Sequence, residues 1–302
     1  MKSQRKETTL LDSSLNTCLL SLKELNKPYY KNYNIKVIDM QDYKQIYIFP
    51  NVKIYREKID NDKKLLFNDN LFNYDKKTRS SFSDNKPLFK NVIRSKIKLQ
   101  RLVKCNANEF KTFITLTFNE DIKDLSIAYK RFIQFIKRTK KIYNDFKWVC
   151  VPEFQKSGRV HYHMITNIDL DNKDLVYTQI EEDKIYYHLM TWSKFIKNKK
   201  EFSNGFDAIE LIKDKEGNDT KKICGYISKY MTKSYIENCF YNKNRYYSSQ
   251  NLIQPYDILI DLDNEKDKLK FETLMKDYEI IYSNDYLDNY DNTINFIEVK
   301  KK

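Results

Sequence analysis

Glycine is scarce in this sequence, and its scarcity excludes several classes of nucleotide-binding protein. Only 4 of the 302 residues are glycine, and the glycine-rich fingerprints of Rossmann and P-loop proteins do not occur. Those fingerprints need glycine because the backbone must come close to the phosphates of the bound nucleotide. A Rossmann enzyme and a P-loop ATPase are therefore excluded, and we expect no nucleotide cofactor.

Cysteine and long apolar runs are also rare. The 5 cysteines form no CxxC pair, and an odd number without such pairs argues against a disulfide framework and against a four-cysteine zinc site. A reducing cytoplasm fits this pattern best. No stretch approaches the roughly 18 uninterrupted apolar residues of a transmembrane helix, so we expect no membrane partner.

The net charge is strongly positive and unevenly distributed. Lys and Arg number 55 against 42 Asp and Glu, which gives +13 for the whole chain. Residues 251–302 hold 7 basic and 12 acidic residues, so residues 1–250 carry +18. This excess favours a polyanion partner. An A/T-rich genome also enriches Lys, Asn, Ile and Tyr, so charge alone does not decide for nucleic acid.

The composition divides the chain into three segments. Residues 1–91 are an N-terminal extension with a charged connector, residues 92–252 the main domain and residues 253–302 an acidic C-terminal appendage. The extension predicts a hairpin whose two strands flank Pro50-Asn51. The appendage predicts one helix near residues 263–278.

The main domain shows regular hydrophobic periodicity. It predicts strands at 112–118, 148–154, 159–165 and 206–212, and helices at 91–104, 124–141, 188–197 and 222–235. This order indicates an α+β fold, a ferredoxin-like or RRM-like antiparallel sheet with helices on one face. Basic residues on the helix at 91–104 are candidate DNA contacts, and they are Arg94, Lys96, Lys98, Arg101 and Lys104; the alternative is a solvated helix face.

Two histidines lie two residues apart in a strand-like run. In a strand, residues i and i+2 point to the same face, so His161 and His163 project side by side. Glu153 lies on the partner strand, across a turn that begins at Gln155, and can be their cross-strand neighbour. Two imidazoles and a carboxylate are a ligand set for a divalent metal. The alternatives are a chance histidine pair and an ordinary exposed Glu.

A tandem Tyr-x-x-Lys repeat follows in a predicted helix. Tyr226 and Tyr230 are separated by one helical turn and stack on one face, with Lys229 and Lys233 three residues after each. Tyrosine is a weak nucleophile because its pKa is near 10, and a nearby cation stabilises the phenolate. The alternative is a helix whose tyrosines pack on the sheet while its lysines reach solvent.

These motifs together resemble those of the HUH endonucleases, above all the replication initiators of single-stranded DNA phages and rolling-circle plasmids. The resemblance covers residues 92–252 and rests on Phe113-Ile-Thr-Leu-Thr-Phe118, Gly158-Arg-Val-His-Tyr-His163 and Tyr226-Ile-Ser-Lys-Tyr230. One departure is Tyr162, at a position where the family usually has a bulky hydrophobic residue.

The resemblance implies a metal-dependent nickase that also rejoins the product strand. His161, His163 and Glu153 would hold Mg²⁺ or Mn²⁺, and Tyr226 would attack origin DNA to leave a 5′-phosphotyrosine and a free 3′-OH. Tyr230 would serve as a second nucleophile. Arg159 is a further candidate DNA contact. Expected partners are single-stranded origin DNA, a host helicase and a polymerase in the cytoplasm of a bacterial host.

Three other functions compete with this interpretation. A two-tyrosine HUH transposase shares the chemistry but typically adds a cysteine-rich zinc module or a helicase, and neither is evident in the sequence. A relaxase places its tyrosine before the histidines, whereas Tyr226 follows them. A non-catalytic single-stranded DNA binder would use tyrosines to stack bases and would need no metal set.

Overall fold

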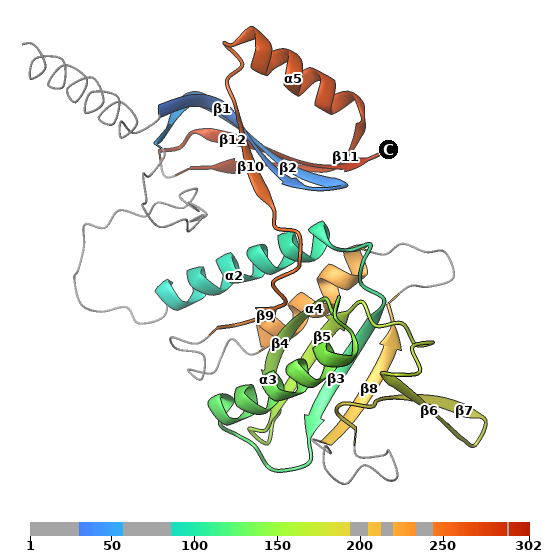
Figure 1. Ribbon diagram of the computed structural model, residues 1–302. Helices are drawn as coiled ribbons and strands as arrows, with labels where there is room; N and C mark the ends of the chain where they lie inside the picture. The colour runs from blue at the N-terminus through green and yellow to red at the C-terminus, as the bar shows by residue number, and fades with distance from the viewer. Residues whose placement is uncertain (1–29, 57–85, 194–204, 213–219, 234–243, 289) are drawn as a thin grey trace, which may run out of the picture. The chain divides into compact units, whose positions relative to one another are not determined.

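The computed structural model of the chain consists of two compact units. It describes residues 30–56, 86–193, 205–212, 220–233, 244–288 and 290–302 (Figure 1). The central unit comprises residues 39–43 and 82–256, and the terminal unit combines residues 1–38, 44–81 and 257–302. In the part of the chain that the structure describes, no helix is long and apolar enough to cross a membrane.

The central unit is built on a five-stranded sheet of order β8-β3-β5-β4-β9, in which all neighbouring strands are antiparallel. Its strands are β3 (Thr112–Phe118), β4 (Trp148–Phe154), β5 (Val160–Thr166), β8 (Gly205–Leu211) and β9 (Tyr247–Ser248). The four longer strands lie where the hydrophobic periodicity predicts them. Strands β4 and β5 form the expected hairpin, in which Gly158 adopts φ 79°.

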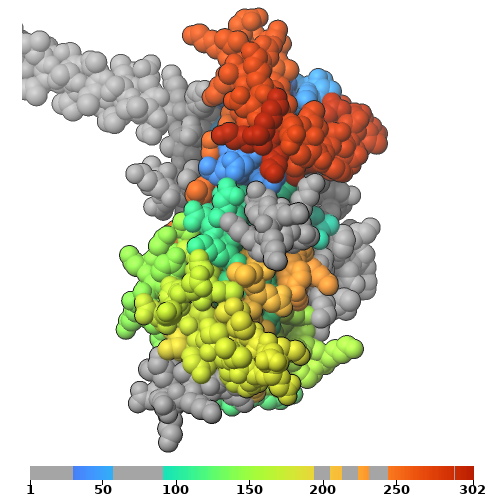
Figure 2. Space-filling view, turned by 90° about the vertical axis from the view of Figure 1, so that its right-hand side faces the viewer, coloured from blue at the N-terminus to red at the C-terminus, as the bar shows by residue number. Residues whose placement is uncertain are grey.

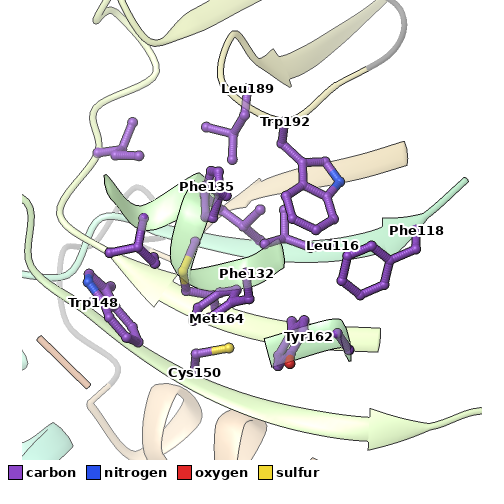
Figure 3. Close-up of a cluster of buried hydrophobic side chains, with 14 of the residues drawn as sticks. Leu116, Phe118, Phe132, Phe135, Trp148, Cys150, Tyr162, Met164, Leu189 and Trp192 are labelled. Atoms are coloured by element: carbon purple, nitrogen blue, oxygen red, sulfur yellow. The ribbon is translucent and has the colours of Figure 1, made fainter. Parts of the chain in front are cut away.

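One face of this sheet is covered by α3 (Leu125–Ile142). The helix begins at Asp124, whose carboxylate accepts hydrogen bonds from the backbone N–H groups of Ser126 and Ile127. Figure 3 shows Phe132 and Phe135 of α3 among side chains from the sheet. Burial of each such phenylalanine stabilises the fold by about 1.5–3 kcal/mol.

The opposite face is covered by α2 (Lys86–Cys105) and α4 (Thr220–Lys233). Leu99, Leu102 and Ile227 of these helices pack against β3, β4 and β5 in a second core cluster. The α+β class is confirmed, but helices lie on both faces of the sheet and not on one (Figure 1). The prediction failed in this respect because periodicity shows that a helix is amphipathic and not which side of the sheet it covers.

The predicted helix at 188–197 is wrong over its described residues. Residues 176–189 instead form a separate hairpin of β6 (Val176–Glu181) and β7 (Lys184–Leu189), which lies on the surface shown in Figure 2 (yellow). Glu182 and Asp183 form its two-residue turn with φ of 48° and 61°. Such turns usually contain glycine, so the sequence carries no turn signal here.

The terminal unit is a second five-stranded sheet, of order β10-β1-β2-β12-β11. Its elements are β1 (Tyr30–Met40), β2 (Tyr43–Arg56), β10 (Tyr256–Ile260), α5 (Glu265–Lys276), β11 (Tyr278–Leu287) and β12 (Thr293–Lys301). The expected helix near 263–278 is confirmed as α5. The extension and the appendage are not separate, because strands from both alternate in this one sheet.

The predicted hairpin about Pro50-Asn51 is also wrong. Strand β2 continues through Pro50, and the turn lies before it at Gln41-Asp42, where Gln41 has φ 65°. Proline fixes φ near −65°, which a strand tolerates where no N–H is required. The Pro-Asn pair was therefore a misleading turn signal.

Gly205 allows β8 to approach β3 closely at the start of the strand. A Cβ atom at this position would lie 1.9 Å from the backbone oxygen of Thr117, so an alanine cannot fit without a backbone shift. We expect Gly205→Ala to lower the free energy of unfolding by about 1–3 kcal/mol, the usual cost of overpacking. Urea denaturation followed by circular dichroism measures this.

Gly225→Ala is the matched control for Gly205→Ala. A Cβ atom at Gly225 would meet nothing within 4 Å, and alanine is the better helix former by about 1 kcal/mol. We expect this variant to be as stable as the wild type or more stable. Equal stability of the two variants would contradict the close approach at Gly205.

Candidate active site

The two histidines of β5 point to the face of the sheet that carries α2 and α4. Tyr162 between them is buried on the other face, against Phe132 of α3. Glu153 of β4 is paired directly with His161 of β5, as the turn predicts. All three side chains, Glu153, His161 and His163, are buried, at 5–6% relative exposure. The hairpin thus brings the predicted ligand set together.

His163 contacts a carboxylate on one side of its ring and a hydroxyl on the other. Its Nε2–H donates to Oε2 of Glu153 at 2.5 Å. With Nε2 as the donor, Nδ1 is left to accept from the hydroxyl of Thr115, 3.2 Å away. The strand neighbour of each histidine in β3 is a threonine, so β3 fixes the orientation of both rings.

His161 has a less saturated environment. Its Nδ1 lies 3.2 Å from Oγ1 of Thr117 and 3.3 Å from Nε2 of Gln155. Its Nε2 is buried and has no hydrogen-bond partner among the described residues. Burial, assisted by the neighbouring His163, lowers the pKa of His161 to about 4. The ring is therefore neutral at physiological pH, the form in which imidazole binds metals.

The two tyrosines of α4 lie over the histidines. The ring of Tyr230 stacks on that of His163, with centroids 3.5 Å apart. Tyr226 lies next to Tyr230, with centroids 5.7 Å apart, and is 42% exposed. Burial and a hydrogen bond with Tyr226 raise the pKa of Tyr230. Of the two hydroxyls, that of Tyr226 is thus on the more accessible side chain.

Phe113 of β3 is a site residue that the sequence analysis missed. Its ring contacts Tyr226 edge-on at 4.6 Å and stacks near Tyr230 and His163, at 5.9 Å from each. It therefore holds both tyrosines against the histidine face. A period-2 pattern in residues 112–118 could have shown that Phe113, Thr115 and Thr117 share one face.

The described part of the site holds no preformed metal centre. Within the described ranges, no group of three His, Cys, Asp or Glu side chains could hold a metal ion as it stands. Nε2 of His163 and Oε2 of Glu153 bond to each other instead. The donors nevertheless fit a divalent cation by their chemistry, two imidazoles and one carboxylate, and Nε2 of His161 is a buried atom that would gain a partner from one.

The other predicted site residues occupy varied positions. Lys229 is exposed on α4, and the side chain of Lys233 lies outside the described residues. Arg159 donates to the backbone oxygens of Phe118 and Glu120. The five predicted contacts Arg94, Lys96, Lys98, Arg101 and Lys104 all lie on α2, and Lys98 is the most exposed of them.

Residues 111–235 match the family model of the replication-associated protein ORF2. This segment belongs to a family of replication initiators. It runs from β3 to the end of α4 and contains every residue of the site described above. The resemblance to replication initiators is confirmed, and the match supports a role in replication initiation. No curated protein and no solved structure matches the chain.

Proposed function

We propose that this replication-associated protein is an endonuclease that starts rolling-circle replication by cutting one DNA strand at an origin. The observation that carries the proposal is the contact between the tyrosines and the histidine face. Tyr230 stacks directly on His163, and Tyr226 lies beside it. A tyrosine that merely covered the sheet would not need a buried His-Glu pair beneath it.

The reaction follows from the accessible hydroxyl. The oxygen of Tyr226 attacks a phosphate of single-stranded DNA and forms a bond to phosphorus, while the bond to the 3′-oxygen breaks. The hydroxyl proton passes to solvent, since Tyr226 is 42% exposed. The 3′-oxygen takes up a proton and becomes a free 3′-OH that a polymerase can extend. The 5′ end stays linked to the protein as a phosphotyrosine until a second transfer rejoins the strand.

The remaining residues position the reacting groups and stabilise charge. Mg²⁺ or Mn²⁺ held by His161, His163 and Glu153 would supply positive charge next to the scissile phosphate. With its proton on Nδ1, His161 donates to Thr117 and directs the lone pair of Nε2 away from that bond. Lys229, three residues after Tyr226, stabilises the phenolate or the phosphate. Tyr230 serves as the second nucleophile.

The partners follow from what the sequence lacks. It has no glycine-rich nucleotide motif, so unwinding falls to a host helicase and extension to a host polymerase, in the cytoplasm of a bacterial host. A two-tyrosine transposase remains the alternative enzyme. Insertion of the cut strand into a new DNA molecule would identify it.

Covalent capture of DNA tests the proposal. Purified protein is incubated with single-stranded DNA of the replicon that carries its gene, with Mg²⁺, with Mn²⁺ or with excess EDTA. We expect a protein–DNA adduct that survives denaturation, a new 3′ end that a polymerase extends, and neither product in EDTA. Folded protein that binds this DNA and forms no adduct with either metal would be a non-catalytic DNA binder.

A further inference from the structure

A cleft of about 840 Å³ lies at the β9 edge of the central sheet, and no residue of the candidate active site lines it. Clefts that bind small molecules and cofactors measure about 300–1,000 Å³. Its walls come from α2, from α3 and from residues 244–250, which include β9. The cleft is therefore a separate concave surface that the proposed nicking reaction does not use.

The charged residues that line the cleft are all cationic. They are Lys98 from α2, Lys140 from α3 and Arg245 from the segment before β9, and the lining includes no Asp or Glu. The neutral polar lining includes Ser95, Ser248 and Gln250. A cationic lining with hydrogen-bonding side chains and no carboxylate suits the phosphates of a polyanion.

Aromatic rings lie between these cations. Tyr129 of α3 stacks on Tyr247 of β9, with centroids 4.7 Å apart and ring planes 29° from parallel. Tyr129 is 37% exposed, so part of its ring is open to the cleft, whose lining also includes Tyr246 and Trp148. A partly exposed ring at the end of a stack is a platform on which a flat, unpaired base extends the stack.

We propose that this cleft binds a second segment of single-stranded DNA, beyond the segment that reacts at Tyr226. Phosphate-binding cations together with stacking aromatics characterise single-stranded nucleic-acid sites. The bases of a duplex stack on each other and leave no face for Tyr129, and an acidic peptide has no base to stack. The assignment of this strand as the one that is nicked rests on the proposed function; the binding itself does not.

The position of β4 shows how one strand could reach both places. Trp148 at the start of β4 lines the cleft, and Glu153 near its end belongs to the active site. Five residue steps at about 3.3 Å each separate them by about 17 Å along the strand. At about 3.4 Å per stacked nucleotide, roughly five nucleotides span this distance.

Binding of a deoxythymidine 12-mer to the full chain in EDTA tests the inference, because no cleavage is expected there. We expect Tyr129→Leu to weaken binding about tenfold, the usual effect of losing one base stack. Lys140→Ala should weaken it several-fold and lower the salt slope by about 0.7, as for one lost phosphate contact. Both variants should leave the unfolding temperature nearly unchanged.

Two substitutions of the same kinds outside the cleft are the controls. Lys137→Ala removes an exposed lysine from the same helix, and Tyr177→Leu an exposed tyrosine from β6; both should bind within twofold of the wild type. Cleft variants that bind like these controls would overturn the inference. So would an equal loss of affinity for inorganic polyphosphate or for a 12-base-pair duplex. A protein that forms no adduct but shows the expected cleft effects would refute only the nicking reaction.

Discussion

His161→Ala is expected to lower the rate of single-stranded DNA cleavage by about 10²- to 10³-fold or more, while DNA binding is retained. Removal of one preorganised electrostatic group from an active site has an effect of this size. His161 offers the one ring nitrogen of the site that is buried without a hydrogen-bond partner among the described residues. Binding should survive because lysines and arginines supply most of the affinity for phosphates.

Thr117→Val is the matched control for His161→Ala. It retains the shape of the side chain and removes only the hydroxyl that lies 3.2 Å from Nδ1 of His161. We expect a smaller loss, about 10- to 100-fold, as is usual for groups that orient a ligand. Gel assays of cleavage over a titration of Mn²⁺ measure both variants. Cleavage by His161→Ala at the wild-type rate, or full activity in EDTA, would refute the metal assignment.

The variant Tyr226→Phe/Tyr230→Phe is expected to form no covalent adduct at all. Each single variant should still nick and should lose circle joining more than the first cut. One tyrosine must hold a DNA end while the other attacks, so two nucleophiles serve a complete cycle. Phenylalanine preserves the stack on His163 at 3.5 Å and the edge contact with Phe113 at 4.6 Å, so only the hydroxyls are lost.

Peptide mapping of the trapped adduct decides between one nucleophile and two. We expect phosphotyrosine on both residues in the wild type, with Tyr226 dominant in the first cut because its ring is the more exposed. Tyr177→Phe, which removes a hydroxyl from the surface of β6, should behave like the wild type. Adduct only on Tyr226, combined with full circle joining by Tyr230→Phe, would make Tyr230 a supporting residue.

The core of the candidate site was predictable because it depends on local geometry. The alternation of β5 and the symmetry of a short hairpin turn suffice to place Glu153 opposite His161, and the structure confirms that register. Helical spacing likewise places Tyr226 and Tyr230 on one face. Phe113 was not predictable in this way, because its contact with α4 joins elements more than 100 residues apart.

The errors in the fold have two physical origins. Turns at Gln41-Asp42 and Glu182-Asp183 use positive φ without glycine, so neither announces itself in the sequence. The second origin is long-range pairing. The alternation of residues 293–301 indicates a strand, β12, but nothing local shows that its sheet partner β2 lies some 240 residues earlier.

The order β10-β1-β2-β12-β11 has a consequence for synthesis of the chain on the ribosome. Strands β1 and β2 emerge first, yet their outer neighbours in the sheet are made last, after the whole of the central unit. Domains generally fold in the order in which they emerge, so we expect the central unit to be folded while β1 and β2 still present two unpaired edges. Such edges invite pairing with other chains. Translation that stalls before residue 256 would therefore yield a product with a formed catalytic sheet and a strong tendency to aggregate.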